Sequence, residues 1–284
     1  MSTNEHSLIR LLPAPAAVTA NPSTPHKRRL GLGKSLSYGW LLGPLLLALL
    51  WTAASGASLI DQHMLPTPWA TVTTAWDLIQ EGRLQSNVAV SLVRVAQGLG
   101  FGVFFGVVIA LISGLSLVGG YLFDSLVQFK RAVPALALIP LFILWFGVGE
   151  DMKVIVIATS VFIPIYIHTH HALRAIDIKH VELAESLSLG HWKFIRHIAL
   201  PGALPGFLLG LRFGAAAALL ALAVVEQVNA TSGIGYMINL ARVYAQSNII
   251  LVGLIVYGLL GLGSDAAVRL LERSLLTWRR TLAQ

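Results

Sequence analysis

Long stretches without a charged side chain recur along this sequence, and they constrain its fold more than any other feature. Five windows of 18 to 29 residues hold no Asp, Glu, Lys or Arg, and a sixth holds only Arg212. Crossing the hydrocarbon core of a bilayer takes about 20 mostly apolar residues in a helix. We therefore predict an all-α integral membrane protein with six transmembrane helices. The predicted helices cover residues 38–59, 90–117, 132–148, 154–174, 202–228 and 246–270.

The composition excludes the main alternative classes. Of the 284 residues 56% are apolar and 12% are charged, whereas an average soluble domain has about 25% charged residues. A disordered or fibrous chain is excluded, and the absence of Cys excludes disulfides and thiolate sites. The net charge of +7 would suggest nucleic acid in a soluble protein. In a membrane protein it indicates a basic cytoplasmic face, so we expect no nucleic-acid partner.

The positions of the basic residues predict the orientation. Fifteen of the 20 Lys and Arg residues lie near the two ends of the chain, in segment 118–131 and in the loop 175–200 with the adjoining Arg174. The positive-inside rule places these regions, and both termini, in the cytoplasm. Residues 1–36 are rich in Pro and polar residues and are expected to form a disordered cytoplasmic tail, with the transmembrane domain over 37–284.

The loop over about 177–199 is long and amphipathic, which is unusual between transmembrane helices. Asp177 can cap a helix start, and Gly190 can end this helix before a second one begins at Trp192. The apolar positions that follow helical spacing are Val181, Ala184, Leu187, Phe194 and Ile198. Such a helix could enter the groove of a partner, or lie at the membrane surface with no partner.

This loop also carries a family resemblance. Glu182 to Pro201 resembles the signature "E-A-A, six on a Gly, then I-x-L-P" of permease subunits in binding-protein-dependent ATP-binding-cassette (ABC) importers, with Leu183 at the middle of the three first positions and Ser188 at the Gly position. Further stretches are similar to the sulfonate, taurine, nitrate and bicarbonate branch of that family. They are Leu65–Pro68, Ser91–Arg94 with Gly98, Pro134–Glu150, Phe162–Tyr166 and Ser232–Met237.

The resemblance implies a type I importer permease in the bacterial inner membrane. Its expected partners are a second copy of the permease, two ABC ATPase subunits, a periplasmic or lipid-anchored binding protein and the lipid bilayer. ATP and Mg²⁺ would be bound by the ATPases, because this chain has no G-x-x-x-x-G-K-[ST] phosphate loop and we expect it to bind no cofactor and to be no enzyme. The residues expected to couple to the ATPase are Glu182, Ala184, Leu187, Ser188 and Gly190.

The expected cargo is a small anion, with aliphatic sulfonates first. Taurine, nitrate, bicarbonate or a pyrimidine precursor are alternatives within the same transporter class. An ion-coupled secondary carrier and an intramembrane enzyme are rival classes, but both are disfavoured because the predicted spans hold almost no Asp or Glu.

Five residues are candidates for the pathway or a gate. Glu226 ends the fifth predicted helix and could brace the gate or lie at the interface, while Arg94 could attract an anion or snorkel to the membrane surface. Arg212 could line the path or neutralise a carboxylate. Gly233 and Gly235 could form a re-entrant turn at the gate or an ordinary loop.

No catalytic residue and no metal site is predicted. Three histidines, His168, His170 and His171, lie near the end of one predicted helix, but no carboxylate or thiol stands near them in the sequence, so a structural role is favoured. Prolines are expected to bend helices at Pro134, Pro140 and Pro164. Small-residue spacings that permit close helix contact, or a dimer seam, involve Gly98, Gly100, Gly102 and Gly106.

Overall fold

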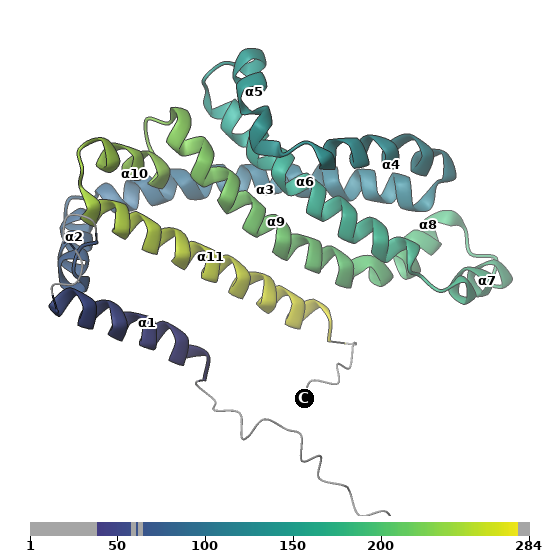
Figure 1. The fold of residues 1–284 in the computed structure, drawn as a ribbon. Coiled ribbons are helices and arrows are strands. Elements are labelled where there is room, and N and C mark those ends of the chain that lie inside the picture. Colours follow the sequence, from purple (N-terminus) through teal and green to yellow (C-terminus); the bar gives the residue numbers. More distant parts are fainter. Residues whose placement is uncertain (1–38, 58–60, 62–64, 278–284) are drawn as a thin grey trace, which may run out of the picture. The chain divides into compact units, whose positions relative to one another are not determined.

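The computed structural model describes residues 39–57, 61 and 65–277, and the regular structure of these residues is helical (Figure 1). The chain divides into two units, residues 1–47 and 48–284. Of the first unit the structure describes residues 39–47, which begin helix α1 (Gly39–Gly56). The predicted tail over 1–36 lies outside the described residues. The rest of the fold concerns the second unit.

Four helices are long and apolar enough to cross a membrane. They are α3 (Arg83–Leu115), α6 (Glu150–Arg174), α9 (Leu200–Asn229) with the helical turns that precede it, and α11 (Ser247–Leu275). The remaining elements are α2 (Pro68–Gln80), α4 (Leu117–Ala132), the 3₁₀ turn η1 (Ala135–Leu138), α5 (Ile139–Phe146), α7 (Ile178–Ser186), α8 (His191–Phe194), the π turn η2 (Ile195–Ala199) and α10 (Ile234–Val243).

The third predicted span differs from a single helix over 132–148. Helices α4 and η1–α5 form a pair bent by 86°, which can count as a fifth, broken span. Pro134 explains the break, because proline disfavours helical backbone in the residue before it and Val133 is extended. Segment 118–131 is therefore mostly helix rather than a loop. The first predicted span corresponds to α1. Its apolar part, Leu42–Gly56, is shorter than the four helices that are long enough to cross a membrane, so the total of six spans stays a prediction.

The core of the bundle is α6, which packs against α3 on one side and α9 on the other (Figure 1). Glycines four residues apart make both contacts close. On α3, added Cβ atoms at Gly98 and Gly102 would lie 2.6 Å from the Cβ atoms of Ile157 and Val161. On α9, a Cβ at Gly210 would lie 3.0 Å from the main-chain oxygen of Pro164. The predicted close helix contact therefore occurs within this chain, while Gly100 has nothing within 4 Å.

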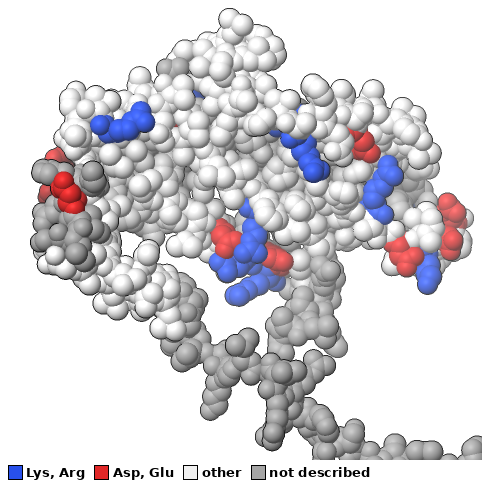
Figure 2. Space-filling view, viewed as in Figure 1, with Lys and Arg blue, Asp and Glu red and all other residues white. Residues whose placement is uncertain are grey.

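The start of helix α2 follows local capping signals. Thr67 caps α2 by accepting a hydrogen bond from the Ala70 N–H at 3.2 Å, and Pro68 begins the helix, a position that suits proline. Charged side chains are sparse on the face seen in Figure 2 and gather around α7 and the C-terminal part of α11. The long helices between these groups present mainly uncharged side chains, as expected for helices in contact with lipid.

Candidate functional site

Arg94 is the buried centre of an ion-pair network at the end of the bundle where α6 begins. Its Nε donates to Glu150 Oε2 at 2.6 Å and its Nη2 to Glu150 Oε1 at 2.7 Å, which makes a two-pronged pair. Its Nη1 donates to Glu226 Oε1 and to the main-chain oxygen of Ser232, both at 2.7 Å. Arg94 is 2% exposed. Snorkelling needs the charged head to reach water, so it does not describe this side chain.

Glu226 lies near the C-terminal end of α9 and is 1% exposed. Besides Arg94, it accepts from the Ser91 hydroxyl at 2.7 Å, from the Gly235 N–H at 2.8 Å and from the Tyr257 hydroxyl at 3.2 Å. These donors come from α3, α10 and α11. A buried carboxylate is stable only when it is paired and hydrogen-bonded, and Glu226 meets both conditions. It therefore ties four helices together at one point.

The loop between α9 and α10 is joined to the same network through its main chain. The Gly233 N–H donates to the Asn87 side-chain oxygen at 2.8 Å, and the Ile234 N–H donates to the Ser91 hydroxyl at 2.9 Å. Gly233 has φ +113°, a conformation that favours glycine. A Cβ here would also fall on the carboxylate of Glu226. Gly233 is thus required both by its backbone and by the space around it.

The network is balanced in charge. Lys153 is 3% exposed and donates from Nζ to Glu150 Oε1 at 2.7 Å, so Arg94 and Lys153 face the two carboxylates of Glu150 and Glu226. An anion that approached this cluster would meet as many negative groups as positive ones. The cluster is therefore suited to hold helices and a loop together rather than to attract cargo. A hollow of about 540 Å³ lies beside it. Its lining residues are Ala89, Val90, Val93, Arg94, Gln97, Glu150 and Ser232.

The other pathway candidate, Arg212, is far from this network along α9. Its Nε donates to Asp265 Oδ1 of α11 at 2.6 Å, and Asp265 also pairs with Arg269. Arg212 therefore neutralises a carboxylate, which is one of the two alternatives open from the sequence. Its side chain remains 45% exposed, so the ion pair does not bury it.

The amphipathic loop forms the short helices α7 and α8. Asp177 caps α7 by accepting from the Lys179 N–H at 3.0 Å, as predicted. Ala184 is buried against the rest of the chain, whereas Leu183 and Leu187 are 55% and 62% exposed. Glu182 is also exposed. An apolar helix face of this kind, outside the long helices, is typical of a surface that a partner covers.

The end of α7 corrects one expectation from the sequence. The helix ends at Ser186 rather than at Gly190, and the turn is made by Ser188, which has φ +51°. The Leu189 N–H donates to the Ala184 oxygen and the Ser188 N–H to the Glu185 oxygen, both at 2.9 Å, which is a Schellman motif. Glycine usually occupies the left-handed residue of this motif. Gly190, with φ −65°, instead precedes α8 in extended conformation.

The three histidines of α6 pack with aromatic or imidazole neighbours. His168 stacks on Phe213 with ring centroids 5.2 Å apart, and His170 stacks on Tyr166 at 5.3 Å. Within the described ranges, no group of three or more His, Cys, Asp and Glu residues could hold a metal ion. His168 therefore serves in packing. His170 also has a carboxylate neighbour that its surroundings in the sequence do not show, because its Nε2 lies 3.6 Å from Asp124 Oδ1 of α4.

Sequence reasoning missed several members of the network. Glu150 and Lys153 stand directly before the predicted span 154–174, where an acidic residue followed three positions later by a basic one was a visible signal. Ser91 stood in a stretch similar to the sulfonate branch, but nothing there assigned it a role. Tyr257 carried no signal, because Tyr is an ordinary residue in apolar helices. The pairing of Arg94 with both carboxylates depends on how three helices meet, which no local pattern records.

Comparison with known proteins shows a family match for this chain. The family described as "Binding-protein-dependent transport system inner membrane component" matches residues 102–277. A Bacillus subtilis (strain 168) protein named as an aliphatic sulfonates transport permease, SsuC, is 39% identical over 247 residues, which are 86% of this chain and 90% of that protein. The taurine transport system permease TauC of Escherichia coli (strain K12) is 29% identical over 249 residues, with the same coverage of 86% and 90%.

A solved structure supports the fold. The crystal structure of an amino acid ABC transporter with histidines matches with a TM-score of 0.57 and 19% sequence identity, over 66% of this chain and 92% of that one. This likeness supports the helical architecture alone.

Removal of the Glu226 carboxylate should destabilise the protein. In Glu226→Ala, Arg94 loses its buried carboxylate partner and keeps Glu150, whose side chain is 58% exposed. Breaking a buried ion pair costs about 3 kcal/mol or more. We expect a clearly lower melting temperature of the detergent-purified protein, measured by fluorescence-detected size exclusion after heating. The control is Glu81→Ala, which removes an exposed ion pair with Arg83 worth about 1 kcal/mol at most. Equal melting temperatures for the two variants would contradict the bracing role.

Glycine at position 188 should stabilise the loop. Ser188→Gly removes the cost of holding a side chain in left-handed backbone, about 1 kcal/mol. Ser188→Val should do the opposite, because β-branched residues tolerate this conformation least. Limited proteolysis of the loop measures the effect, with Gly190→Ala as the control, because Gly190 has ordinary backbone and open space around it. Faster cleavage of Ser188→Gly than of the natural chain would show that the left-handed turn at Ser188 does not limit the stability of the loop.

Proposed function

This chain belongs to the family of binding-protein-dependent transport system inner membrane components, and we propose that, as the permease subunit of an ABC importer, it carries aliphatic sulfonates into a bacterial cell. The observation that carries the cargo proposal is the 39% identity to a sulfonate permease over nine-tenths of that protein's length. Taurine is the second candidate, because a taurine permease is 29% identical over a comparable length. Taurine and the simple alkanesulfonates are all small organic sulfonates.

The proposed machine needs other subunits. A second copy of this chain completes the pathway, two ATPase subunits bind ATP and Mg²⁺, and a periplasmic or lipid-anchored protein delivers the cargo. Residues 37–284 form the permease domain in the inner membrane, and both termini face the cytoplasm. In this orientation the Arg94 network lies toward the outside and α7 toward the cytoplasm, at opposite ends of α6.

Two surfaces then have distinct roles. Helix α7 docks into the ATPase through its exposed apolar side chains, and the loop 177–199 transmits the movement. The network of Arg94, Glu150 and Glu226 closes the outer end of the bundle and holds the turn at Gly233 in place. Support for the first role comes from the exposure of Leu183 and Leu187, and for the second from the four donors around Glu226.

Uptake into proteoliposomes tests the cargo. The complete complex, with its ATPase and binding protein, should accumulate radiolabelled ethanesulfonate when ATP is supplied, and unlabelled taurine should compete more weakly than unlabelled ethanesulfonate. This chain alone, reconstituted without the ATPase, should transport neither compound. ATP-dependent uptake of taurine with no uptake of ethanesulfonate would replace the first cargo by the second. Transport by the chain alone would overturn the importer assignment.

A charge on the exposed face of α7 should uncouple the complex. Leu183 and Leu187, four residues apart, share one helix face, and Leu183→Asp should lower co-purification of the ATPase subunit at least tenfold because it buries a charge at the contact. Glu185, which is also exposed, lies midway between them on the opposite face. Glu185→Gln should therefore co-purify the ATPase like the natural chain. Equal co-purification with both variants would exclude docking through this face.

A further inference from the structure

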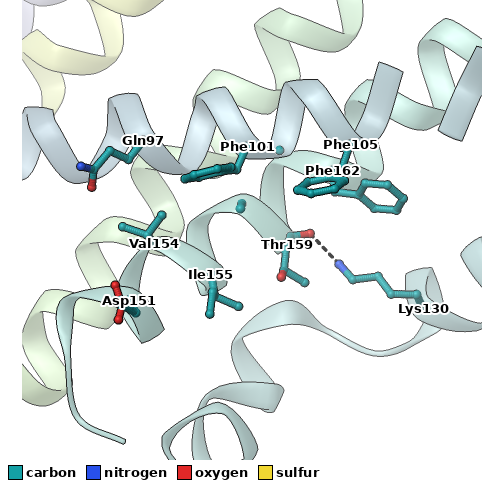
Figure 3. Close-up of a pocket in the computed structure, with 11 residues that line it drawn as sticks. Gln97, Phe101, Phe105, Lys130, Asp151, Val154, Ile155, Thr159 and Phe162 are labelled. Atoms are coloured by element: carbon teal, nitrogen blue, oxygen red, sulfur yellow. Dashed lines mark hydrogen bonds between the residues drawn. The ribbon is translucent and has the colours of Figure 1, made fainter. Parts of the chain in front are cut away.

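A hollow of about 700 Å³ lies between α3, α4 and α6, beside the Arg94 network (Figure 3). Most of its lining is apolar, with Phe101 and Phe105 from α3 and Phe162 from α6. One cation, Lys130 from the last turn of α4, lines the end near Phe162, and Asp151 lines the opposite end (Figure 3). The hollow is therefore polar at its ends and apolar between them.

Lys130 has no carboxylate to neutralise it among the described residues. Its Nζ donates to the main-chain oxygen of Thr159 at 2.7 Å, which is a neutral partner. The acidic residue of the lining, Asp151, precedes Thr159 by eight positions of α6, about 12 Å along the helix. The buried cations described in the bundle, Arg94 and Lys153, are each paired with a carboxylate. Lys130, which is half-buried, is the exception.

The position of the Lys130 ammonium group along α6 makes the lack of a carboxylate partner significant. Thr159 is the tenth of the 25 residues of α6, so the ammonium group lies about 14 Å along a helix about 37 Å long. A charged side chain well inside a membrane-spanning bundle is costly, and such residues mark substrate or ion pathways. The broken span brings it there, because α4 ends at Ala132 instead of continuing past α6.

The hollow continues toward the Arg94 network rather than standing alone. Gln97 lines both this hollow and the smaller one beside Arg94. Along α3, the lining positions Val90, Arg94, Gln97, Phe101 and Phe105 follow one another at intervals of three or four residues. Such spacing places them on one face of the helix. One face of α3 thus runs from the balanced network to the unbalanced Lys130.

We propose that this hollow is a transit site for an organic monoanion with an apolar body, in which the small oxyanion head binds Lys130 and the body lies along Phe101, Phe105 and Phe162. The ammonium group, which no carboxylate neutralises among the described residues, supplies the charge that the head needs. The carboxylate of Asp151 repels a second negative group at the far end, so dianions are disfavoured. This inference rests on the proposed function and adds the residues that recognise the cargo inside the membrane.

The aromatic lining predicts a preference among cargoes. Each methylene group of an alkyl chain that leaves water strengthens binding to an apolar surface, so a longer alkanesulfonate gains more from Phe101 and Phe105 than a short one does. An inorganic anion would use Lys130 alone. The site therefore favours hexanesulfonate over ethanesulfonate, and either of them over sulfate.

The test is uptake by the complete complex in proteoliposomes, with hexanesulfonate, ethanesulfonate and sulfate as probes. Lys130→Gln should lower uptake of both sulfonates at least tenfold, and Lys130→Arg should keep most of it. The matched control is Arg131→Gln, which removes one positive charge from the adjacent, exposed position and should leave uptake within twofold. Co-purification of the ATPase verifies that each variant assembles.

A second pair of variants tests the phenylalanine side chains that line the hollow. This pair also tests the proposal if the Lys130→Gln variant does not assemble with the ATPase. Phe101→Ala should reduce the preference for hexanesulfonate over ethanesulfonate at least threefold. Phe104→Ala removes an equally large, exposed ring of α3 that does not line the hollow, and it should leave the preference unchanged. If the natural complex transports sulfonates but neither Lys130→Gln nor Phe101→Ala differs from its control, this inference is overturned and the proposed function stands. If the natural complex transports no sulfonate, both fail.

Discussion

The close contact of α6 with α3 and α9 is the constraint on which the rest of the structure depends. Glycines at intervals of four residues remove the side chains that would hold these helices apart, so the backbones approach and the branched side chains of α6 fill the remaining space. Only at this separation can the guanidinium of Arg94 reach Glu150 and Glu226 together. The ion-pair network is thus a result of helix packing, and it in turn fixes the loop that precedes α10.

Much of this architecture could be predicted from the sequence, because membrane helices are encoded by length and composition alone. The helix start at Asp177 was predicted from local capping chemistry and is confirmed. The start of α2 at Pro68, behind the capping residue Thr67, follows the same chemistry. The break at Pro134 was expected as a bend, but the sequence did not show that α4 would form a separate helix before it. Apolar composition indicates that a segment enters the membrane. It does not indicate whether one unbroken helix crosses the whole bilayer.

The candidate site was less predictable. Arg94, Glu226 and Gly233 were identified from the sequence because charges and glycines are conspicuous beside apolar helices, but their mutual contacts link positions more than 130 residues apart. The sequence also left Arg94 open between two roles, and the structure shows a third, in which it joins two carboxylates. Lys130 was counted only among the cations expected at the cytoplasmic face, since its partial burial depends on the broken span.

The helical segment that leads into α9 has a mechanical consequence. Helices α8, η2 and α9 run without interruption from His191 to Val228, so the turn that precedes α8 and the Glu226 carboxylate lie at the two ends of one helical segment about 50 Å long. A helical segment transmits a displacement along its axis only where it is rigid. The π turn at Ile195–Ala199 contains an extra residue per turn, and it can take up a register slip before the segment moves. Small displacements at one end would then be absorbed, and only large ones would reach the other.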